Sequence, residues 1–116
     1  MSAAGKRKGS QFECDLLRYF RETVSLPAER LHLAGQKDEG DLAVQDIGLT
    51  YLIEAKAEAR MTFASYVKEA RIEAAHYAFA RGIDPERVFP LAVVKRAGLP
   101  IGESYVVSTL TDFFRQ

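Results

Sequence analysis

Two acidic residues and a lysine in the middle of the chain have the types and spacing that metal-dependent hydrolysis needs. Gly40-Asp41 is followed by twelve residues and then by Glu54-Ala55-Lys56. In a strand, Glu54 and Lys56 point to the same face, roughly 7 Å apart, and Ala55 points into the packing on the other side. Two converging carboxylates repel each other unless a cation lies between them, and hard oxygen ligands select Mg²⁺ or Mn²⁺. A neighbouring lysine can orient a water molecule or offset charge on a phosphate.

The same pattern also occurs on the solvated face of an ordinary hairpin, where it has no chemical role. The preceding residues favour the chemical interpretation. Tyr51-Leu52-Ile53 is an apolar run that should lie in the interior, and it leads directly into Glu54 and Lys56. Charged side chains that follow a buried strand are less often simply solvated than those on an amphipathic edge.

The first element that must position this group is a helix predicted over 10–23. Phe12, Leu16, Leu17 and Phe20 recur at helical spacing. Ser10 is a candidate N-cap, and Glu13 lies three residues further on, the spacing of a capping box. Residues 1–9 are small or basic, and we expect them to form a flexible N-terminal arm ahead of a single domain over 10–116.

The remaining elements follow from β-prone runs, helical periodicity and turn residues. We expect Ile47-Gly48-Leu49 to form the tight turn of a hairpin, and we expect Leu110, Phe113 and Phe114 to pack on the core. The predicted strands are 31–33, 42–47, 50–56, 88–94 and 105–107, and the further helices are 62–81 and 109–115. This order predicts an α/β fold with a mixed sheet.

Composition limits the class of protein. The 116 residues are 47% hydrophobic and 28% charged, with 16 Lys+Arg against 16 Asp+Glu. These values are typical of one globular domain. We expect neither a membrane helix nor a secretory signal, because no apolar run is long enough. The single cysteine, Cys14, favours a reducing cytoplasm.

Zero net charge by itself argues against a nucleic-acid partner, but the charge is unevenly distributed. Lys6, Arg7 and Lys8 place +3 in the first nine residues, so the remainder carries −3. Any of these side chains can also be an ordinary solvated charge. The candidate DNA contacts are Lys6, Arg7, Lys8, Lys68, Arg71, Lys95 and Arg96.

Taken together, the motifs resemble the PD-(D/E)xK nuclease superfamily. The motifs are Lys8-Gly9 and Glu13 on the first helix, Gly40-Asp41, and Ile53-Glu54-Ala55-Lys56. They are most similar to those of the archaeal-type Holliday junction resolvases and their phage relatives, along nearly the whole chain. The resemblance implies a restriction-endonuclease-like αβββαβ core, with a central mixed sheet flanked by helices.

The resemblance also implies roles for individual residues. Glu13, Asp41 and Glu54 match the metal-binding acids, and Lys56 matches the catalytic lysine; Glu13 has the alternative role of helix-cap partner. The implied cofactor is Mg²⁺, with Mn²⁺ as a substitute and no small-molecule cofactor. Metal-polarised phosphate is then attacked in line by a water that Lys56 aligns. The chain departs from the family in having Gly40 before Asp41 instead of proline, and no glutamine over 65–69.

The resulting hypothesis is a magnesium-dependent endonuclease that cuts branched DNA at four-way (Holliday) junctions. We expect a homodimer that nicks two opposing strands, in the cytoplasm of a prokaryote or a phage-infected cell. Its dimer surface is expected on the late strands or the Phe113-Phe114 helix. The alternatives are a nuclease of the same superfamily that acts on flaps or on recombination or repair ends, and a non-catalytic module that binds branched DNA.

Overall fold

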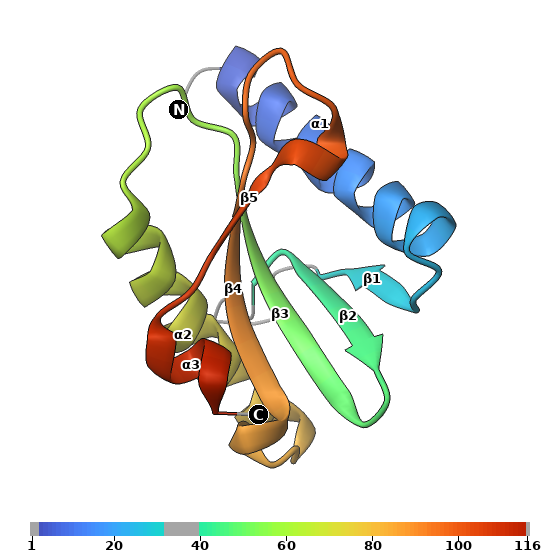
Figure 1. Ribbon diagram of the computed structural model, residues 1–116, viewed down its shortest axis with the longest axis vertical. Helices are drawn as coiled ribbons and strands as arrows, with labels where there is room; N and C mark the ends of the chain where they lie inside the picture. The colour runs from blue at the N-terminus through green and yellow to red at the C-terminus, as the bar shows by residue number, and fades with distance from the viewer. Residues whose placement is uncertain (1–2, 32–39, 116) are drawn as a thin grey trace.

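The computed structural model describes residues 3–31 and 40–115, and it has an α/β architecture with a mixed five-stranded sheet (Figure 1). The strands follow one another across the sheet in chain order, from β1 to β5. Their bounds are β1 Ala28–Arg30, β2 Leu42–Asp46, β3 Leu49–Lys56, β4 Val88–Val94 and β5 Tyr105–Val107. The α-helices are α1 Ala3–Arg18, α2 Phe63–Arg81 and α3 Leu110–Phe114, and one π-helical turn, Tyr19–Thr23, extends α1. The predicted α/β fold with a mixed sheet is therefore confirmed.

The first helix begins earlier than predicted. It starts at Ala3, so residues 3–9, which we expected to form a flexible arm, are its first turns. Alanine, lysine and arginine in this segment are strong helix formers, which explains the extension. Ser10 consequently lies inside the helix and is not an N-cap. Its Oγ accepts a hydrogen bond from Arg30 at 3.0 Å instead.

The first strand was also predicted at the wrong place. β1 is Ala28–Arg30, whereas we expected residues 31–33, of which 32 and 33 lie outside the described residues. Pairing with β2 determines the register, with Ala28 opposite Val44 and Arg30 opposite Leu42. The alternating residues Leu31-His32-Leu33 therefore suggested a strand just beyond the actual one.

The central strand β3 is paired with a neighbouring strand along both of its edges. It pairs antiparallel with β2 and parallel with β4, and the helix α2 makes the crossover that a parallel pair requires. It ends at Lys56 as predicted. Successive residues of β3 enter different cores: Ile53 packs with Phe12 and Leu16 of α1, while Leu52 packs with Ala74 and residues near it on α2.

The hairpin between β2 and β3 turns at Ile47-Gly48, as predicted. Both residues have positive φ, 41° for Ile47 and 77° for Gly48. Such a pair of angles is typical of a type I′ turn, which matches the twist of the flanking strands. The Ile47 side chain is 97% exposed, at the end of β3 opposite to Glu54 and Lys56.

The C-terminal helix was placed correctly, but its packing was not. Leu110 is 77% exposed, Phe113 59% and Phe114 73%, so these side chains do not join the core as we expected. An ion pair connects α3 to α2, because Arg71 Nε lies 2.7 Å from Asp112 Oδ2. Among the described residues, no helix is both long and apolar enough to cross a membrane.

Candidate active site

Asp41 is fixed by the backbone around it. Its amide donates to the Ile53 carbonyl at 3.0 Å, and its Oδ2 accepts the Ala55 amide at 2.8 Å. The preceding Gly40 has a φ of +100°, and a Cβ at this position would collide with Leu52 Cδ1. A residue without a side chain is therefore required where the chain turns Asp41 toward the end of β3.

Glu54 and Lys56 lie on the face of β3 that α2 covers. Glu54 is 6% exposed, and Lys56 Nζ lies 3.8 Å from its Oε1. The same ammonium donates to Glu69 Oε2 at 3.0 Å and lies 5.4 Å from the ring centroid of Tyr66. Ala55 points to the opposite face and packs with the α1 core, as the strand alternation predicted.

Glu13 approaches the same place from α1. One cavity of about 340 Å³ is lined by Glu13, Asp41, Glu54 and Lys56, so the structure brings the four predicted catalytic residues together. Arg30 of β1 also lines this cavity, and its Nε donates to Glu13 Oε1 at 3.0 Å. Glu13 is thus the partner of Arg30 and not a helix-cap partner.

The two buried acids have strongly raised pKa values. Burial raises the pKa of Asp41 to about 8, and a hydrogen bond with Glu54 and its negative charge add to this. Burial also raises the pKa of Glu54 to about 9, together with the neighbouring carboxyl of Glu73, against the opposing influence of Asp41 and Lys56. Ionised carboxyls in this position need a compensating cation.

The basic groups at the cavity remain charged. Burial alone would lower the pKa of Lys56, but the hydrogen bond to Glu69 and the charge of Glu54 raise it above the ordinary lysine value. The hydrogen bond to Glu13 raises the pKa of Arg30. The cavity is therefore lined by a lysine and an arginine beside four acids, Glu13, Asp41, Glu54 and Glu58, a set that can bind a cation and a phosphate side by side.

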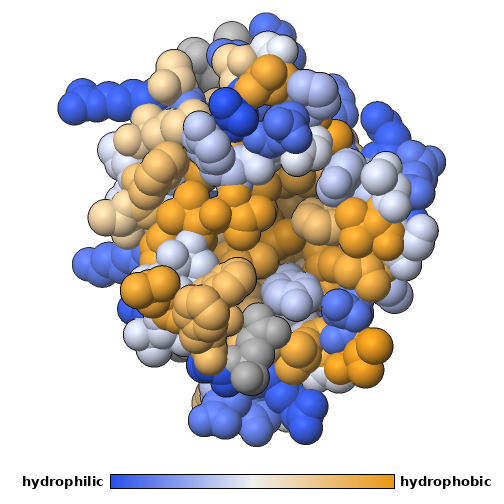
Figure 2. Space-filling model, in the orientation of Figure 1, coloured by the Kyte–Doolittle hydropathy of each residue, from blue (hydrophilic) through white to orange (hydrophobic). Residues whose placement is uncertain are grey.

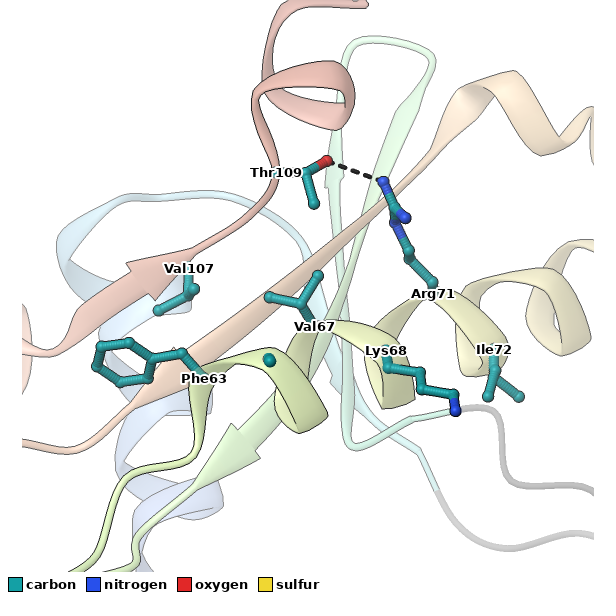
Figure 3. Close-up of a pocket in the computed structure, with 8 residues that line it drawn as sticks. Phe63, Val67, Lys68, Arg71, Ile72, Val107 and Thr109 are labelled. Atoms are coloured by element: carbon teal, nitrogen blue, oxygen red, sulfur yellow. Dashed lines mark hydrogen bonds between the residues drawn. The ribbon is translucent and has the colours of Figure 1, made fainter.

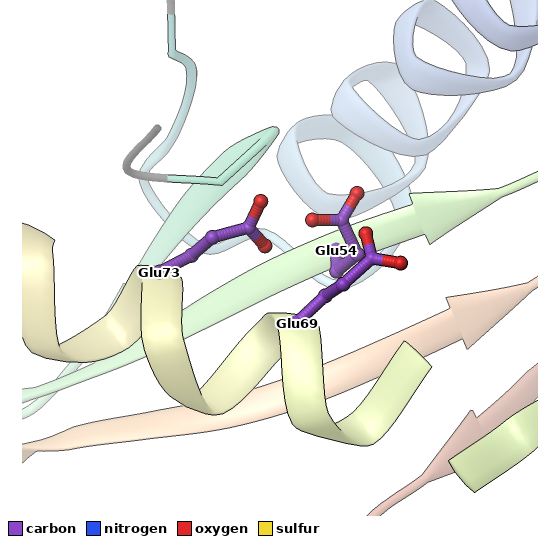
Figure 4. Close-up of side chains that lie close together, drawn as sticks. All are labelled: Glu54, Glu69 and Glu73. Carbon is purple, nitrogen blue, oxygen red and sulfur yellow. The ribbon is translucent and has the colours of Figure 1, made fainter. Parts of the chain in front are cut away.

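Three functional candidates were missed by the sequence reasoning: Arg30, Glu69 and Glu73. Arg30 was missed because β1 was placed too late in the chain. Glu69 and Glu73 are four residues apart on α2 and both point toward Glu54 (Figure 4). Their carboxylate oxygens and that of Glu54 all lie within 4.8 Å of one another. Their spacing on one helix face was the available signal.

The basic residues predicted to contact DNA fall into two regions. Lys8 and Lys95 line a smaller cavity that shares Ala57 and Glu58 with the acidic one, so both lie beside it. Arg7 is exposed on the same helix as Lys8, and the Lys6 side chain lies outside the described residues. Arg96 stacks on Tyr105, with its guanidinium 4.6 Å from the ring centroid.

Lys68 and Arg71 lie elsewhere. They line an apolar groove of about 490 Å³ between α2, β5 and α3, together with Phe63, Val67 and Ile72 (Figure 3). Arg71 donates to Thr109 Oγ1 at 2.9 Å as well as to Asp112. The structure therefore separates these two residues from those that line the acidic cavity.

Among solved structures, an archaeal protein has a similar fold. Archaeoglobus fulgidus Hjc, a Holliday junction resolvase from an archaeal hyperthermophile, aligns with a TM-score of 0.52 and 17% sequence identity. The alignment covers 85% of this chain and 87% of that chain. No family model and no curated protein sequence matches the chain. At this identity the similarity shows a shared fold, in agreement with the resemblance that the motifs indicated.

Proposed function

We propose that the protein is a divalent-metal-dependent endonuclease of the Holliday junction resolvase family. One observation carries this proposal: Asp41, Glu54 and Lys56 meet Glu13 around one cavity at the end of β3. The fold shared with Hjc, a Holliday junction resolvase, supports the choice of branched DNA as substrate.

The donor set fits a hard divalent cation. Asp41 and Glu54 offer carboxylate oxygens from neighbouring segments, and no donor among the described residues reaches the buried Oε2 of Glu54. These two residues would hold Mg²⁺ or Mn²⁺, and Glu13 would approach it through the carboxylate oxygen that Arg30 does not take. When bound, the metal polarises the scissile phosphate.

Lys56 and Arg30 supply the remaining functions of the site. Lys56 lines the cavity, where its ammonium orients the attacking water or neutralises charge on the phosphate. Arg30 keeps Glu13 in place and offers further donors to a phosphate oxygen. Lys8, Arg7 and Lys95 lie on or beside the rim and contact the flanking DNA phosphates.

A four-way junction requires two cuts, whereas the described residues of one chain bring these acids and the lysine together around one cavity, so we propose a homodimer. The surface best suited to the second copy is the apolar face formed by α2, β5 and α3. Figure 2 shows apolar side chains gathered around a hollow near the middle of the face in view. The exposed apolar residues on these three elements include Ile72, Val106, Leu110, Phe113 and Phe114. Water-exposed apolar area of this kind marks an interaction surface.

The proposal is tested by incubating the protein with a four-way junction, a flap and a linear duplex, in Mg²⁺ or in EDTA. We expect paired, symmetric nicks on the junction in Mg²⁺ alone. Asp41→Asn and Glu54→Gln should abolish cutting and leave junction binding largely intact, because they remove metal ligands and keep the shape of the side chain. The matched control is Glu86→Gln, an exposed acid on the 3₁₀-helix Pro85–Arg87, which should cut normally.

Other outcomes select the alternatives. Preferred cutting of the flap would indicate a nuclease for other DNA structures. Junction binding without cutting in either Mg²⁺ or Mn²⁺ would indicate a non-catalytic module. Undiminished cutting by Asp41→Asn would contradict the assigned site.

A further inference from the structure

Glu54 has two more acids on its other side, and they belong to α2. We propose that Glu54, Glu69 and Glu73 form a second divalent-cation site, which shares Glu54 with the site of Asp41 and takes a hard ion such as Mg²⁺, Mn²⁺ or Ca²⁺. The binding itself does not depend on nuclease activity. Its catalytic consequence rests on the proposed function.

The geometry of the three side chains suits one ion. Glu69 and Glu73 lie one helical turn apart, and Figure 4 shows both reaching toward Glu54 across the gap between α2 and β3. Their ligand oxygens lie within 4.8 Å of one another. That span is about twice a metal–oxygen distance of roughly 2.4 Å, so a single ion can contact all three after small side-chain movements.

A second observation points to a ligand at this position. Glu54 is 6% exposed, and its buried Oε2 is reached by no donor among the described residues. The neighbouring carboxyl of Glu73 adds to the cost of ionising Glu54. A buried oxygen that no donor satisfies, beside further carboxyls, is the environment that a bound cation stabilises.

The Lys56 side chain lies beside the same group of acids. Its ammonium lies 3.0 Å from Glu69 Oε2 and 3.8 Å from Glu54 Oε1, and it pairs with two of the three acids. A divalent ion on Glu69 would replace the ammonium there, and Lys56, which already lines the cavity, would be free to serve the proposed reaction.

The test is direct measurement of Mn²⁺ binding without DNA, by electron paramagnetic resonance and calorimetry. We expect about two ions per chain in the wild type and about one in Glu69→Gln or in Glu73→Gln. Asp41→Asn should retain the ion on α2. Glu86→Gln serves as the control and should bind as the wild type does.

Glu69→Gln is expected to fold normally, because the Glu69 side chain is 46% exposed and its replacement leaves the core unchanged. A loss of Mn²⁺ binding in this variant is therefore not explained by misfolding. Unchanged Mn²⁺ binding in folded Glu69→Gln and Glu73→Gln would overturn the second site, and so would the absence of any binding to the wild type. A single ion that survives Asp41→Asn but is lost in Glu69→Gln would support this site and contradict the one proposed at Asp41. Junction cutting is assayed separately, so the two proposals fail independently.

Discussion

At the scale of the residue, the site is organised around a buried glutamate. Glu54 follows three residues of an interior strand and meets Asp41 on one side and Glu73 on the other. Its ordinary alternative, a solvated carboxylate on a hairpin, is excluded by its 6% exposure. The arrangement is costly for a metal-free protein when the acids ionise, because their charges are close and poorly hydrated.

This cost predicts a pH dependence of stability. In EDTA, Asp41 and Glu54 keep their protons up to about pH 8 and 9 in the folded protein, whereas in the unfolded chain they ionise near pH 4. Between these values the folded state binds more protons, so the free energy of unfolding falls as the pH rises. A change of about 1 kcal/mol moves the melting temperature of such a domain by roughly 4 °C. We therefore expect the melting temperature in EDTA to fall by several degrees as the pH rises through this range.

Thermal unfolding of the wild type and of Asp41→Asn in EDTA, at a series of pH values, checks this expectation. The amide side chain of this variant cannot ionise, so the variant should show a shallower decline. Glu86→Gln, which changes an exposed acid, should follow the wild type. Equal slopes for the wild type and Asp41→Asn would mean that Asp41 ionises freely in the folded protein.

At the scale of the element, the β2–β3 hairpin holds a local conflict between residue and conformation. Ile47 has a φ of 41°, in a region that β-branched residues rarely adopt, and its side chain is almost fully exposed. The backbone of this turn suits Asn-Gly, the preferred pair for a type I′ turn. Ile47 therefore strains the turn and gains little burial in return.

We predict that Ile47→Asn stabilises the protein by about 1 kcal/mol, because asparagine tolerates positive φ. Urea unfolding measures the effect. Gly48→Ala is the contrasting variant and should destabilise, since Gly48 also has positive φ, 77°. A midpoint for Ile47→Asn at or below that of the wild type would show that the turn is not strained.

The elements differ in how far the sequence predicts them. β3 and α2 follow from a bulky apolar run and a long helical stripe, and both lie within a residue of their predicted bounds. β1 is three residues long, so its place is decided by pairing with β2 and not by its own pattern. The apolar residues of α1 predict the part of the helix that packs on the core. They do not predict the basic turns before Ser10.

The residues of the site also differ in how far the sequence predicts them. The spacing of Asp41, Glu54 and Lys56 within one hairpin gave three of its members, because strand pairing brings them together predictably. Arg30 and Glu73 reach the cavity or Glu54 only through tertiary packing, from β1 and α2. No local pattern marks Arg30. The local signal for Glu73 was its spacing from Glu69, which places two acids on one helix face.

At the scale of the whole molecule, the exposed apolar residues of α2, β5 and α3 are the surface on which the proposed homodimer depends. Phe113 and Phe114 are two of these residues, and their rings are in edge contact at 4.9 Å between centroids. Because both side chains are mostly exposed, replacing them by serine should leave the fold intact.

We predict that Phe113→Ser with Phe114→Ser weakens dimerisation at least tenfold, about 1.4 kcal/mol, because apolar area is lost from the shared surface. Sedimentation velocity measures the association, and junction cutting should change from paired cuts to single nicks. Leu99→Ser, on an exposed apolar residue of another loop, is the control and should remain dimeric. A double variant that sediments as the wild type does would place the second copy on another surface.

The position of β3 has a consequence for the way the protein opens. This strand pairs on both edges and has a separate apolar core on each face, whereas β5 and α3 lie at the exposed side of the sheet. In hydrogen–deuterium exchange, the amides of β3 should therefore exchange by global unfolding, and those of β5 and α3 by local opening. Glu54 and Lys56 lie on β3, the strand that we expect to exchange most slowly, so fraying of the C-terminal elements should leave the acidic cavity in place.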